Sequence, residues 1–199
     1  LAGDPATRSL AIVGGGPAGL ELAFAARRRY GPALRIQLIG RTPFNADPVL
    51  AAANRLIIEA LTRHRIDWMA DNPVVSASET ALHCADGSTI EADLVWVATP
   101  VQPASWLDQT ALQRCSQGFL QVNAHLQCLG HPRVYAVGDV ATLAQSRPRS
   151  GVMAVRAGQY LAKHLGAILS DRRVAPFRPQ RRWLTLLNTA DQQAILVHG

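Results

Sequence analysis

The residues that most clearly indicate a chemical function are three glycines in the run "AIVGGGPAGLELA", residues 11–23. In a G-x-G-x-x-G pattern the first glycine lets a strand turn sharply, the second lets a pyrophosphate approach the backbone, and the third lets a helix pack closely on the strand. The unpaired N–H groups and the positive end of that helix then hold the phosphates. The run therefore predicts a nucleotide site formed by Gly14, Gly15, Gly16, Pro17 and Gly19.

This glycine pattern also occurs in purely structural turns, so its surroundings decide how it is interpreted. A short apolar run at residues 9–13 precedes it, and a helical pattern extends from Pro17 to about Tyr30. A second apolar run, Leu34 to Ile39, follows and ends at Gly40. These segments predict a β-α-β unit of about thirty residues, which is the setting that nucleotide binding requires.

The end of the second apolar run bears on which dinucleotide fits. Dinucleotide-binding proteins usually carry an acidic residue about twenty residues after the glycines, where it holds the ribose hydroxyls. This chain instead has Gly40 followed by Arg41, which leaves room for a 2′-phosphate and offers it a bidentate donor. Two interpretations stay open: Arg41 binds NADP(H), or Arg41 is a solvated loop residue and the nucleotide is NAD(H).

The middle of the chain changes from helical to strand patterns. An amphipathic helix is predicted around Val49 to His64. The stretch "VVSASETALHCADGSTIEADLVWVATP" then predicts short antiparallel strands with turns at Ser78-Glu79 and Asp86-Gly87. It ends in a buried strand at Leu94 to Ala98. An antiparallel three-stranded insert before a buried strand is therefore expected.

The last part of the chain predicts strands, one helix and a terminal hairpin. Strands are expected at Phe119 to Val122 and at Arg133 to Val137. Ser150 is a suitable N-cap for a helix from Gly151 to Ile168. Two strand-like runs, Arg182 to Leu187 and Ala194 to Val197, then predict a hairpin.

A second chemical feature lies in the stretch "HPRVYAVGDVATL", residues 131–143. Gly138 permits a close approach of the backbone, and the carboxylate of Asp139 can accept hydrogen bonds from a sugar-like polyol. A Gly-Asp pair by itself is a common turn. Its distance from the first glycine motif and the intervening "DGSTIEADLVWVATP" favour a functional interpretation.

Together these segments resemble the FAD-dependent pyridine nucleotide-disulfide oxidoreductase family. In that family a run like "GGGPAGLELA" opens the NAD(P)H domain, one like "DLVWVAT" closes it, and one like "VYAVGDVA" returns the chain to the FAD domain. The resemblance implies an α/β, three-layer ββα, Rossmann-like FAD/NAD(P)-binding fold with a three-stranded antiparallel insert. It implies an NAD(P)H-binding domain at residues 1–103 and the C-terminal part of an FAD-binding domain, including the hairpin, at residues 104–199.

The resemblance also implies roles for individual residues. Gly138 and Asp139 would bind FAD, Asp139 through the ribityl chain. The helix that starts at Gly151 and Val152 would point its positive end at the flavin pyrimidine. Thr99 would contact the cofactor, although Pro100 replaces the family's usual glycine after it and supplies no N–H.

Glu21 is the candidate catalytic residue. In relatives with a similar "G-x-E-L-A" run, a glutamate there lies near the nicotinamide and the flavin, where it can orient the cofactor or transfer a proton. The alternative is an acid that is favoured near a helix N-terminus by the helix dipole, worth about 0.3–1 kcal/mol. Both interpretations stay open.

Within the family the chain looks most like the type II NADH dehydrogenase branch, particularly the flavoprotein module fused to selenide, water dikinase. The family's FAD domain begins with its own earlier glycine motif, and this chain has one such motif, so a fragment that starts at the NAD(P)H domain is expected. Its partners would be a nicotinamide dinucleotide and the missing FAD domain or a fused enzyme domain, and it would form a homodimer.

The expected activity is transfer of a hydride from NAD(P)H to FAD, followed by reduction of a quinone or of a selenium or sulfur species. The alternative is a redox-inactive binding module, because Gly40 and Pro100 both depart from cofactor-contacting patterns.

Composition excludes several other classes of protein. The net charge of +6 comes almost wholly from scattered arginines, which indicates solvated surfaces rather than a nucleic-acid interface. The 3 cysteines lack C-x-x-C spacing and the 6 histidines lack ligand spacing, so neither a dithiol relay nor a metal site is expected. Apolar stretches stop short of the ~20 residues that span a bilayer. A cytoplasmic setting is expected, with peripheral membrane association if the acceptor is a quinone.

Overall fold

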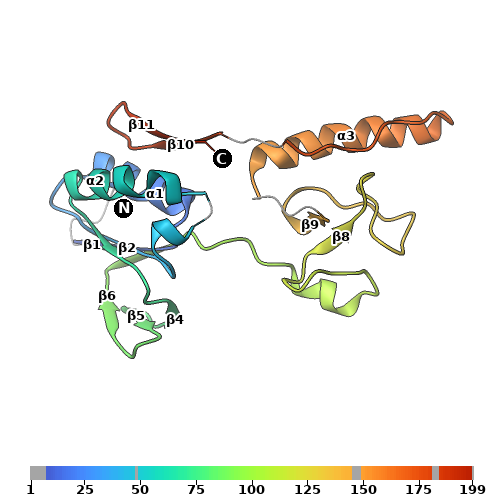
Figure 1. Cartoon of the computed structure of the whole chain (residues 1–199). Coiled ribbons are helices and arrows are strands. Elements are labelled where there is room, and N and C mark those ends of the chain that lie inside the picture. Colours follow the sequence, from blue (N-terminus) through green and yellow to red (C-terminus); the bar gives the residue numbers. More distant parts are fainter. Residues whose placement is uncertain (1–7, 48, 145–148, 181–183, 199) are drawn as a thin grey trace. The chain divides into compact units, whose positions relative to one another are not determined.

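The computed structural model describes residues 8–47, 49–144, 149–180 and 184–198 of the 199-residue chain. The chain forms two compact units. Unit 1 comprises Leu1–Pro100 together with Arg182–Gly199, and unit 2 comprises Val101–Arg181. Each unit has its own buried core, and each can be followed by its colours in Figure 1.

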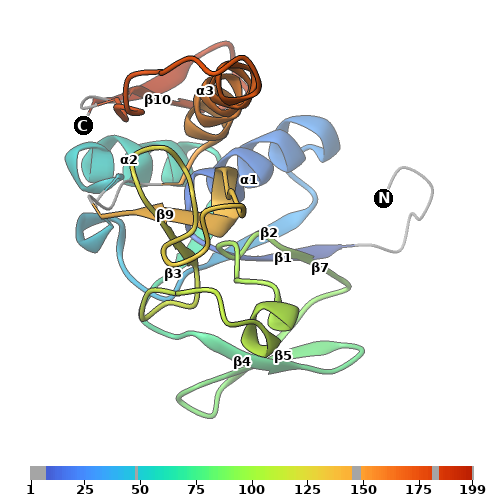
Figure 2. The same cartoon turned by 90° about the vertical axis from the view of Figure 1, so that its right-hand side faces the viewer.

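Unit 1 is built on a 4-stranded parallel sheet with the order β3-β2-β1-β7 (Figure 2). These strands are β1 (Ser9–Val13), β2 (Arg35–Ile39), β3 (Ile66–Met69) and β7 (Leu94–Val97). The central strand β1 is apolar throughout its middle, and Leu10, Ala11 and Ile12 are fully buried. A parallel strand that is covered on both faces has this continuous apolar character.

Helices cover one face of this sheet and the antiparallel insert covers the other (Figure 1). The helices are α1 (Pro17–Tyr30) and α2 (Asn54–Arg63), the second preceded by 3-10 turns at Phe44–Ala46 and Ala51–Ala53. The insert consists of β4 (Val74–Ala77), β5 (Ala81–Cys84) and β6 (Thr89–Glu91), and its Leu82 and Ile90 pack with Ala11 and Ile39. The predicted Rossmann-like α/β fold with a three-stranded antiparallel insert is therefore confirmed.

The predicted hairpin is present as β10 (Leu184–Asn188) and β11 (Ala194–His198), with Arg182 and Trp183 outside the described residues. Its buried side chains Leu187, Ile195 and Val197 belong to the apolar core of unit 1. The hairpin thus belongs to unit 1, whereas the motifs predict a domain at residues 104–199 that includes it. The difference arises because one apolar face of the hairpin packs against α1 and the turn at Ala51–Ala53, contacts that are remote in sequence.

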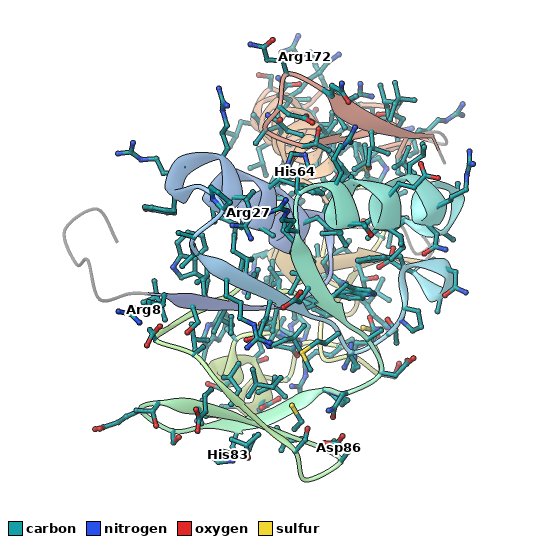
Figure 3. All side chains as sticks on the ribbon, turned by 90° about the vertical axis from the view of Figure 1, so that its left-hand side faces the viewer. Arg8, Arg27, His64, His83, Asp86 and Arg172 are labelled. Atoms are coloured by element: carbon teal, nitrogen blue, oxygen red, sulfur yellow. The ribbon has the colours of Figure 1, made fainter. Side chains whose placement is uncertain are left out.

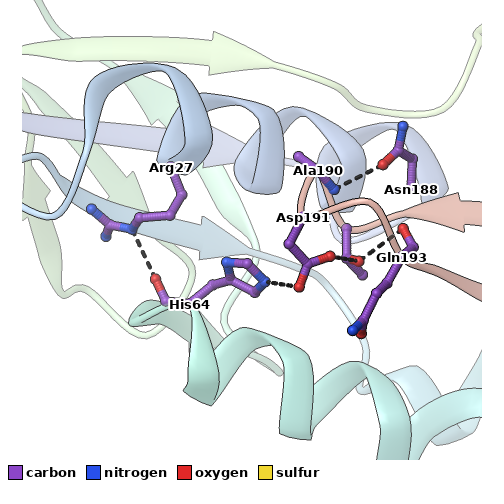
Figure 4. Close-up of polar contacts among 7 residues, drawn as sticks. Arg27, His64, Asn188, Ala190, Asp191 and Gln193 are labelled. Atoms are coloured by element: carbon purple, nitrogen blue, oxygen red, sulfur yellow. Dashed lines mark hydrogen bonds and ion pairs between the residues drawn. The ribbon is translucent and has the colours of Figure 1, made fainter.

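Arg27 donates hydrogen bonds to backbone carbonyl groups at and just beyond the C-terminal ends of α1 and α2 (Figures 3 and 4). Its Nε donates to the carbonyl of His64 at 2.8 Å, and its Nη2 donates to the carbonyl of Arg65 at 2.8 Å. Its Nη1 donates to the carbonyls of Gly31 and Leu34 at 2.6 and 2.7 Å. One guanidinium therefore satisfies the carbonyl groups at which α1 and α2 end.

Replacing Arg27 with methionine keeps the apolar stem but leaves these carbonyl groups without their donor. We expect the free energy of unfolding to fall by about 2–3 kcal/mol, because hydrogen bonds from a charged donor to partly buried acceptors are lost. Chemical denaturation measures the effect. The exposed neighbour Arg28→Met is the control and should stay within about 0.5 kcal/mol of the parent. Equal losses in both variants would contradict this account.

Unit 2 contains fewer regular elements. The parallel pair β8 (Leu120–Val122) and β9 (Ala141–Leu143) packs with α3 (Gly151–Leu169) around a core that includes Leu107, Leu126 and Ala157. Ser150 caps α3, because its Oγ accepts a hydrogen bond from the N–H of Met153 at 3.3 Å, as predicted.

The predicted strand at Arg133–Val137 is wrong. In the described part of unit 2 this segment makes an isolated bridge between Tyr135 and Gln127 and no continuous ladder. An apolar run becomes a strand only where a neighbour pairs with it over several residues.

Aromatic and imidazole rings stack beside the core of unit 2. The rings of His125 and His164 lie 4.8 Å apart, and Tyr160 stacks on His164 at 5.6 Å. Nδ1 of His125 and the hydroxyl of Tyr160 form a hydrogen bond of 2.7 Å. Burial, and then the nearby His125, lower the pKa of the His164 imidazole below its ordinary value of 6.5.

This lowered pKa gives unit 2 a stability that depends on pH. The unfolded chain binds a proton at His164 more readily than the folded chain does, so stability is present above about pH 6.5 and is lost as pH falls toward the folded pKa. We expect the loss between about pH 7 and pH 5 to be smaller in His164→Leu. Denaturation at a series of pH values measures it. His83→Leu, at an exposed histidine, serves as the control. A pH profile of His164→Leu that matches that of the parent would contradict the expectation.

Candidate functional site

Three strands of the parallel sheet end together at one edge. Val13 of β1 lies opposite Ile39 of β2 and Val97 of β7. The N–H of Gly14 donates to the carbonyl of Ile39 at 2.8 Å, and the N–H of Ala98 donates to that of Val13 at 2.8 Å. The segments after these strands therefore meet at the carboxyl edge of the sheet, where open α/β sheets bind their ligands.

Two of the motif glycines are required by close contacts. A Cβ on Gly14, which has a φ of +131°, would lie 2.2 Å from the carbonyl oxygen of Ala98. A Cβ on Gly19 would lie 1.7 Å from the carbonyl oxygen of Gly14. A side chain at either position would push apart the strand ends or lift α1 off β1.

Gly16 has a different role from these two. Among the described residues other than Gly16 itself and its two chain neighbours, no atom lies within 4 Å of the position that its Cβ would take. The next residue, Pro17, begins α1, and proline suits a first helical position because its missing N–H needs no partner there. The turn therefore leaves open space in front of the positive end of a helix, where an anion binds favourably.

The other predicted residues of unit 1 surround this turn. Arg41 is exposed two residues after the end of β2, and the exposed Thr99 follows β7, with its backbone nitrogen next to Gly14. Glu21 lies on α1, where its Oε1 accepts a hydrogen bond from the N–H of Asn188 at 2.9 Å. This bond ties the hairpin to α1, and the catalytic role of Glu21 stays a prediction.

The turn of the hairpin is fixed by a second contact of this kind (Figure 4). Nε2 of His64 lies 3.1 Å from Oδ2 of Asp191. Hydrogen bonds from Thr189 and then from His64 lower the pKa of the Asp191 carboxyl below 3.8. The hairpin therefore has a defined position over the helices of unit 1.

Sequence reasoning missed Trp68, whose indole lies beside the glycine turn. A Cβ on Gly15 would lie 2.5 Å from its Cη2, and a Cβ on Gly40 would lie 2.2 Å from the same atom. Phe44, which is 1% exposed, stacks on the indole with ring centres 4.1 Å apart. The short β3 that carries Trp68 gave no clear signal, because its four residues are too few to establish a pattern.

A second group of predicted residues gathers in unit 2. Gly138, with a φ of +73°, and the exposed Asp139 form a 3-10 turn beside the start of α3. Both line a pocket together with Ser150 and Met153 from the first turn of that helix. The predicted Gly151 and Val152 lie in this first turn and are exposed.

Arg149 is a second residue that the sequence did not single out. Its Nε donates to the carbonyl of Asp139 at 3.0 Å, and its guanidinium lies 3.4 Å from the centre of the Phe119 ring. These contacts hold a cation at the pocket wall. A charged loop residue gives no periodic signal, so its position becomes evident only in the fold.

Other kinds of site find no support in the described part of the chain. No group of three or more histidine, cysteine or acidic side chains is arranged to hold a metal ion among the described residues. Cys84 and Cys128 are buried and unpaired. Within the same residues, every helix is too short or too polar to cross a bilayer.

Comparison with known proteins agrees with this geometry. The sequence profile of the family described as "Pyridine nucleotide-disulphide oxidoreductase" matches residues 2–158. The chain is 32% identical to the "Demethylphylloquinone reductase NdbB" of a Synechocystis species, over 86% of this chain and 44% of that protein. It is 25% identical to an "NADH dehydrogenase-like protein" of Mycobacterium tuberculosis, over 100% of this chain and 53% of that protein. The chain thus spans about half the length of the curated relatives it matches.

Solved structures show the same fold. The structure described as "Fdr9" superposes with a TM-score of 0.74 at 25% identity, over 92% of this chain and 46% of that one. A covalent putidaredoxin reductase–putidaredoxin complex gives a TM-score of 0.71 at 23% identity, over 92% and 45% of the two chains. The family resemblance deduced from the motifs is confirmed, and the predicted cofactors FAD and NAD(P)H are those of the family.

The two kinds of motif glycine should differ in their effect on stability. Gly19→Ala places a methyl group against the Gly14 carbonyl, and we expect it to destabilise the chain by about 1–3 kcal/mol through overpacking. Gly16→Ala enters open space at a φ of −75° and should change stability by less than about 1 kcal/mol. Thermal unfolding measures both. A Gly16→Ala variant as unstable as Gly19→Ala would show that the turn is packed differently.

Proposed function

Because the chain belongs to the pyridine nucleotide-disulphide oxidoreductase family, we propose that it is the nicotinamide-binding part of a flavoenzyme. Unit 1 binds NAD(P)H at the carboxyl edge of its parallel sheet. Unit 2 supplies part of the FAD site. The observation that carries the proposal is the open space at Gly16 between two glycines that are closely packed.

The glycine turn suits the pyrophosphate of a dinucleotide. Gly16 leaves the backbone accessible, and the first N–H groups of α1 have no acceptors within the helix. The helix dipole adds a favourable field for negative charge, worth about 0.3–1 kcal/mol at an exposed site. Arg41 and Thr99 lie after the neighbouring strands and bound the site on either side of β1.

Residues around the pocket of unit 2 are suited to hold part of a flavin nucleotide. The positive φ of Gly138 exposes the backbone at the turn, and the exposed Asp139 carboxylate can accept hydrogen bonds from ribityl hydroxyls. The first turn of α3, with Gly151 and Val152, directs the positive end of a 19-residue helix toward the same pocket. An FAD held there by Gly138 and Asp139 would supply the hydride-accepting and electron-transferring chemistry.

The electron acceptor that we propose is a quinone, with a selenium or sulfur species as the alternative. One relative is named for demethylphylloquinone reduction and another is an "NADH oxidase". The same proposal has four further parts. The chain belongs to the type II NADH dehydrogenase branch, and it is fused to a selenide, water dikinase. It forms a homodimer and associates peripherally with a membrane. The presence of glycine at position 40 is explained by its packing against Trp68, so it is no longer an argument for a redox-inactive module.

Gly16→Val tests the nucleotide site directly. The valine side chain would fill the space that the pyrophosphate needs, so we expect the affinity for NADH and NADPH to fall by more than about tenfold, or 1.4 kcal/mol. Calorimetric titration of the 199-residue chain measures it. Ala25→Val, at an exposed position of the same helix, is the matched control and should bind normally. Undiminished affinity in Gly16→Val would exclude this site.

A further inference from the structure

We propose that Trp68 forms the wall of the adenosine subsite and takes the place of the acidic residue that usually follows β2. The proposal rests on the proposed function, because it assigns a part of the same dinucleotide site. The ligand class is the adenosine half of a nicotinamide dinucleotide, with or without a 2′-phosphate.

The indole of Trp68 spans two positions that are far apart in the sequence. Its Cη2 would lie 2.5 Å from a Cβ on Gly15, which belongs to the glycine turn. The same atom would lie 2.2 Å from a Cβ on Gly40, at the end of β2. Because phosphates bind at the first position and ribose hydroxyls are held at the second, the indole borders the space through which the adenosine connects them.

The ring is held firmly, and the residue that carries it is not fully buried. Phe44 is buried and stacks on the indole at 4.1 Å with an angle of 15° between the rings. Trp68 itself is only half-buried. A fixed, partly exposed aromatic ring is a good surface for a purine, because every base has a π-face and little side-chain freedom is lost on binding.

This arrangement also affects the choice between NADH and NADPH. Gly40 must remain glycine while Trp68 is present, so the carboxylate that usually binds the ribose hydroxyls has no place there. A 2′-phosphate therefore meets no negative charge at Gly40 and finds the exposed Arg41 as the next residue. The site thus accepts NADPH at least as well as NADH.

Trp68→Phe separates binding from packing. Phenylalanine keeps an aromatic ring to stack on Phe44 but removes the ring atoms over Gly15 and Gly40. We expect calorimetry to show about tenfold weaker binding of ADP-ribose, in line with the loss of an aromatic–base contact. Binding of nicotinamide mononucleotide should not change. The control is Trp106→Phe, at an exposed tryptophan of unit 2.

Gly40→Asp tests the link between the two residues. In the parent the new side chain collides with Trp68, so stability should fall. In the Trp68→Phe background the same substitution should be tolerated, and the double variant should bind NADH in preference to NADPH. Equal destabilisation in both backgrounds, with no change in nucleotide preference, would overturn the proposal.

The possible outcomes separate this inference from the proposed function. A parent chain that binds neither NADPH nor ADP-ribose would refute the nucleotide site as a whole. A parent that binds both, with unchanged ADP-ribose affinity in Trp68→Phe, would refute only the role of Trp68. If Trp68→Phe does not fold, emission decides in a chain that keeps Trp68 as its single tryptophan (Trp96→Phe, Trp106→Phe and Trp183→Phe): quenching by ADP-ribose supports the subsite, and unchanged emission overturns it.

Discussion

The close approach of Gly19 to the Gly14 carbonyl is the contact on which unit 1 depends. It allows α1 to lie directly on the end of β1, and the pairing of β1 with β2 and β7 brings the carboxyl ends of these strands together. The same contact directs the N-terminus of α1 into open space at Gly16. One steric requirement therefore produces both the layered core and the nucleotide site at its edge.

The reason that glycine is needed differs from one position of this site to the next. At Gly14 and Gly19 a side chain would collide with a backbone oxygen. At Gly15 and Gly40 it would collide with the indole of Trp68. At Gly16 it would fill the open space that a ligand needs. Unit 2 repeats part of this arrangement, because Gly138 adopts a positive φ beside the first turn of α3. In both units a glycine-containing turn lies beside the positive end of a helix, a combination suited to phosphates and polyols.

Local patterns predicted the β-α-β unit, the insert and the capped helix, because periodicity, turn residues and N-caps act over a few residues. The position of the hairpin and the contacts of Trp68 could not be predicted in this way. The bond from Asn188 to Glu21 joins residues 167 positions apart, and Trp68 meets Gly15 only after three strands have paired. Such contacts depend on tertiary packing and leave no spacing in the sequence.

The central claim is that a dinucleotide binds at the carboxyl edge of the sheet in unit 1. Nuclear magnetic resonance of the uniformly ¹⁵N-labelled chain during titration with NADPH tests it most directly. The account predicts saturable shifts of the backbone amides of Gly14, Gly15, Gly16 and Arg41, with little change on the exposed insert around His83. Shifts that leave the glycine turn unaffected, or that appear on the insert instead, would contradict the account.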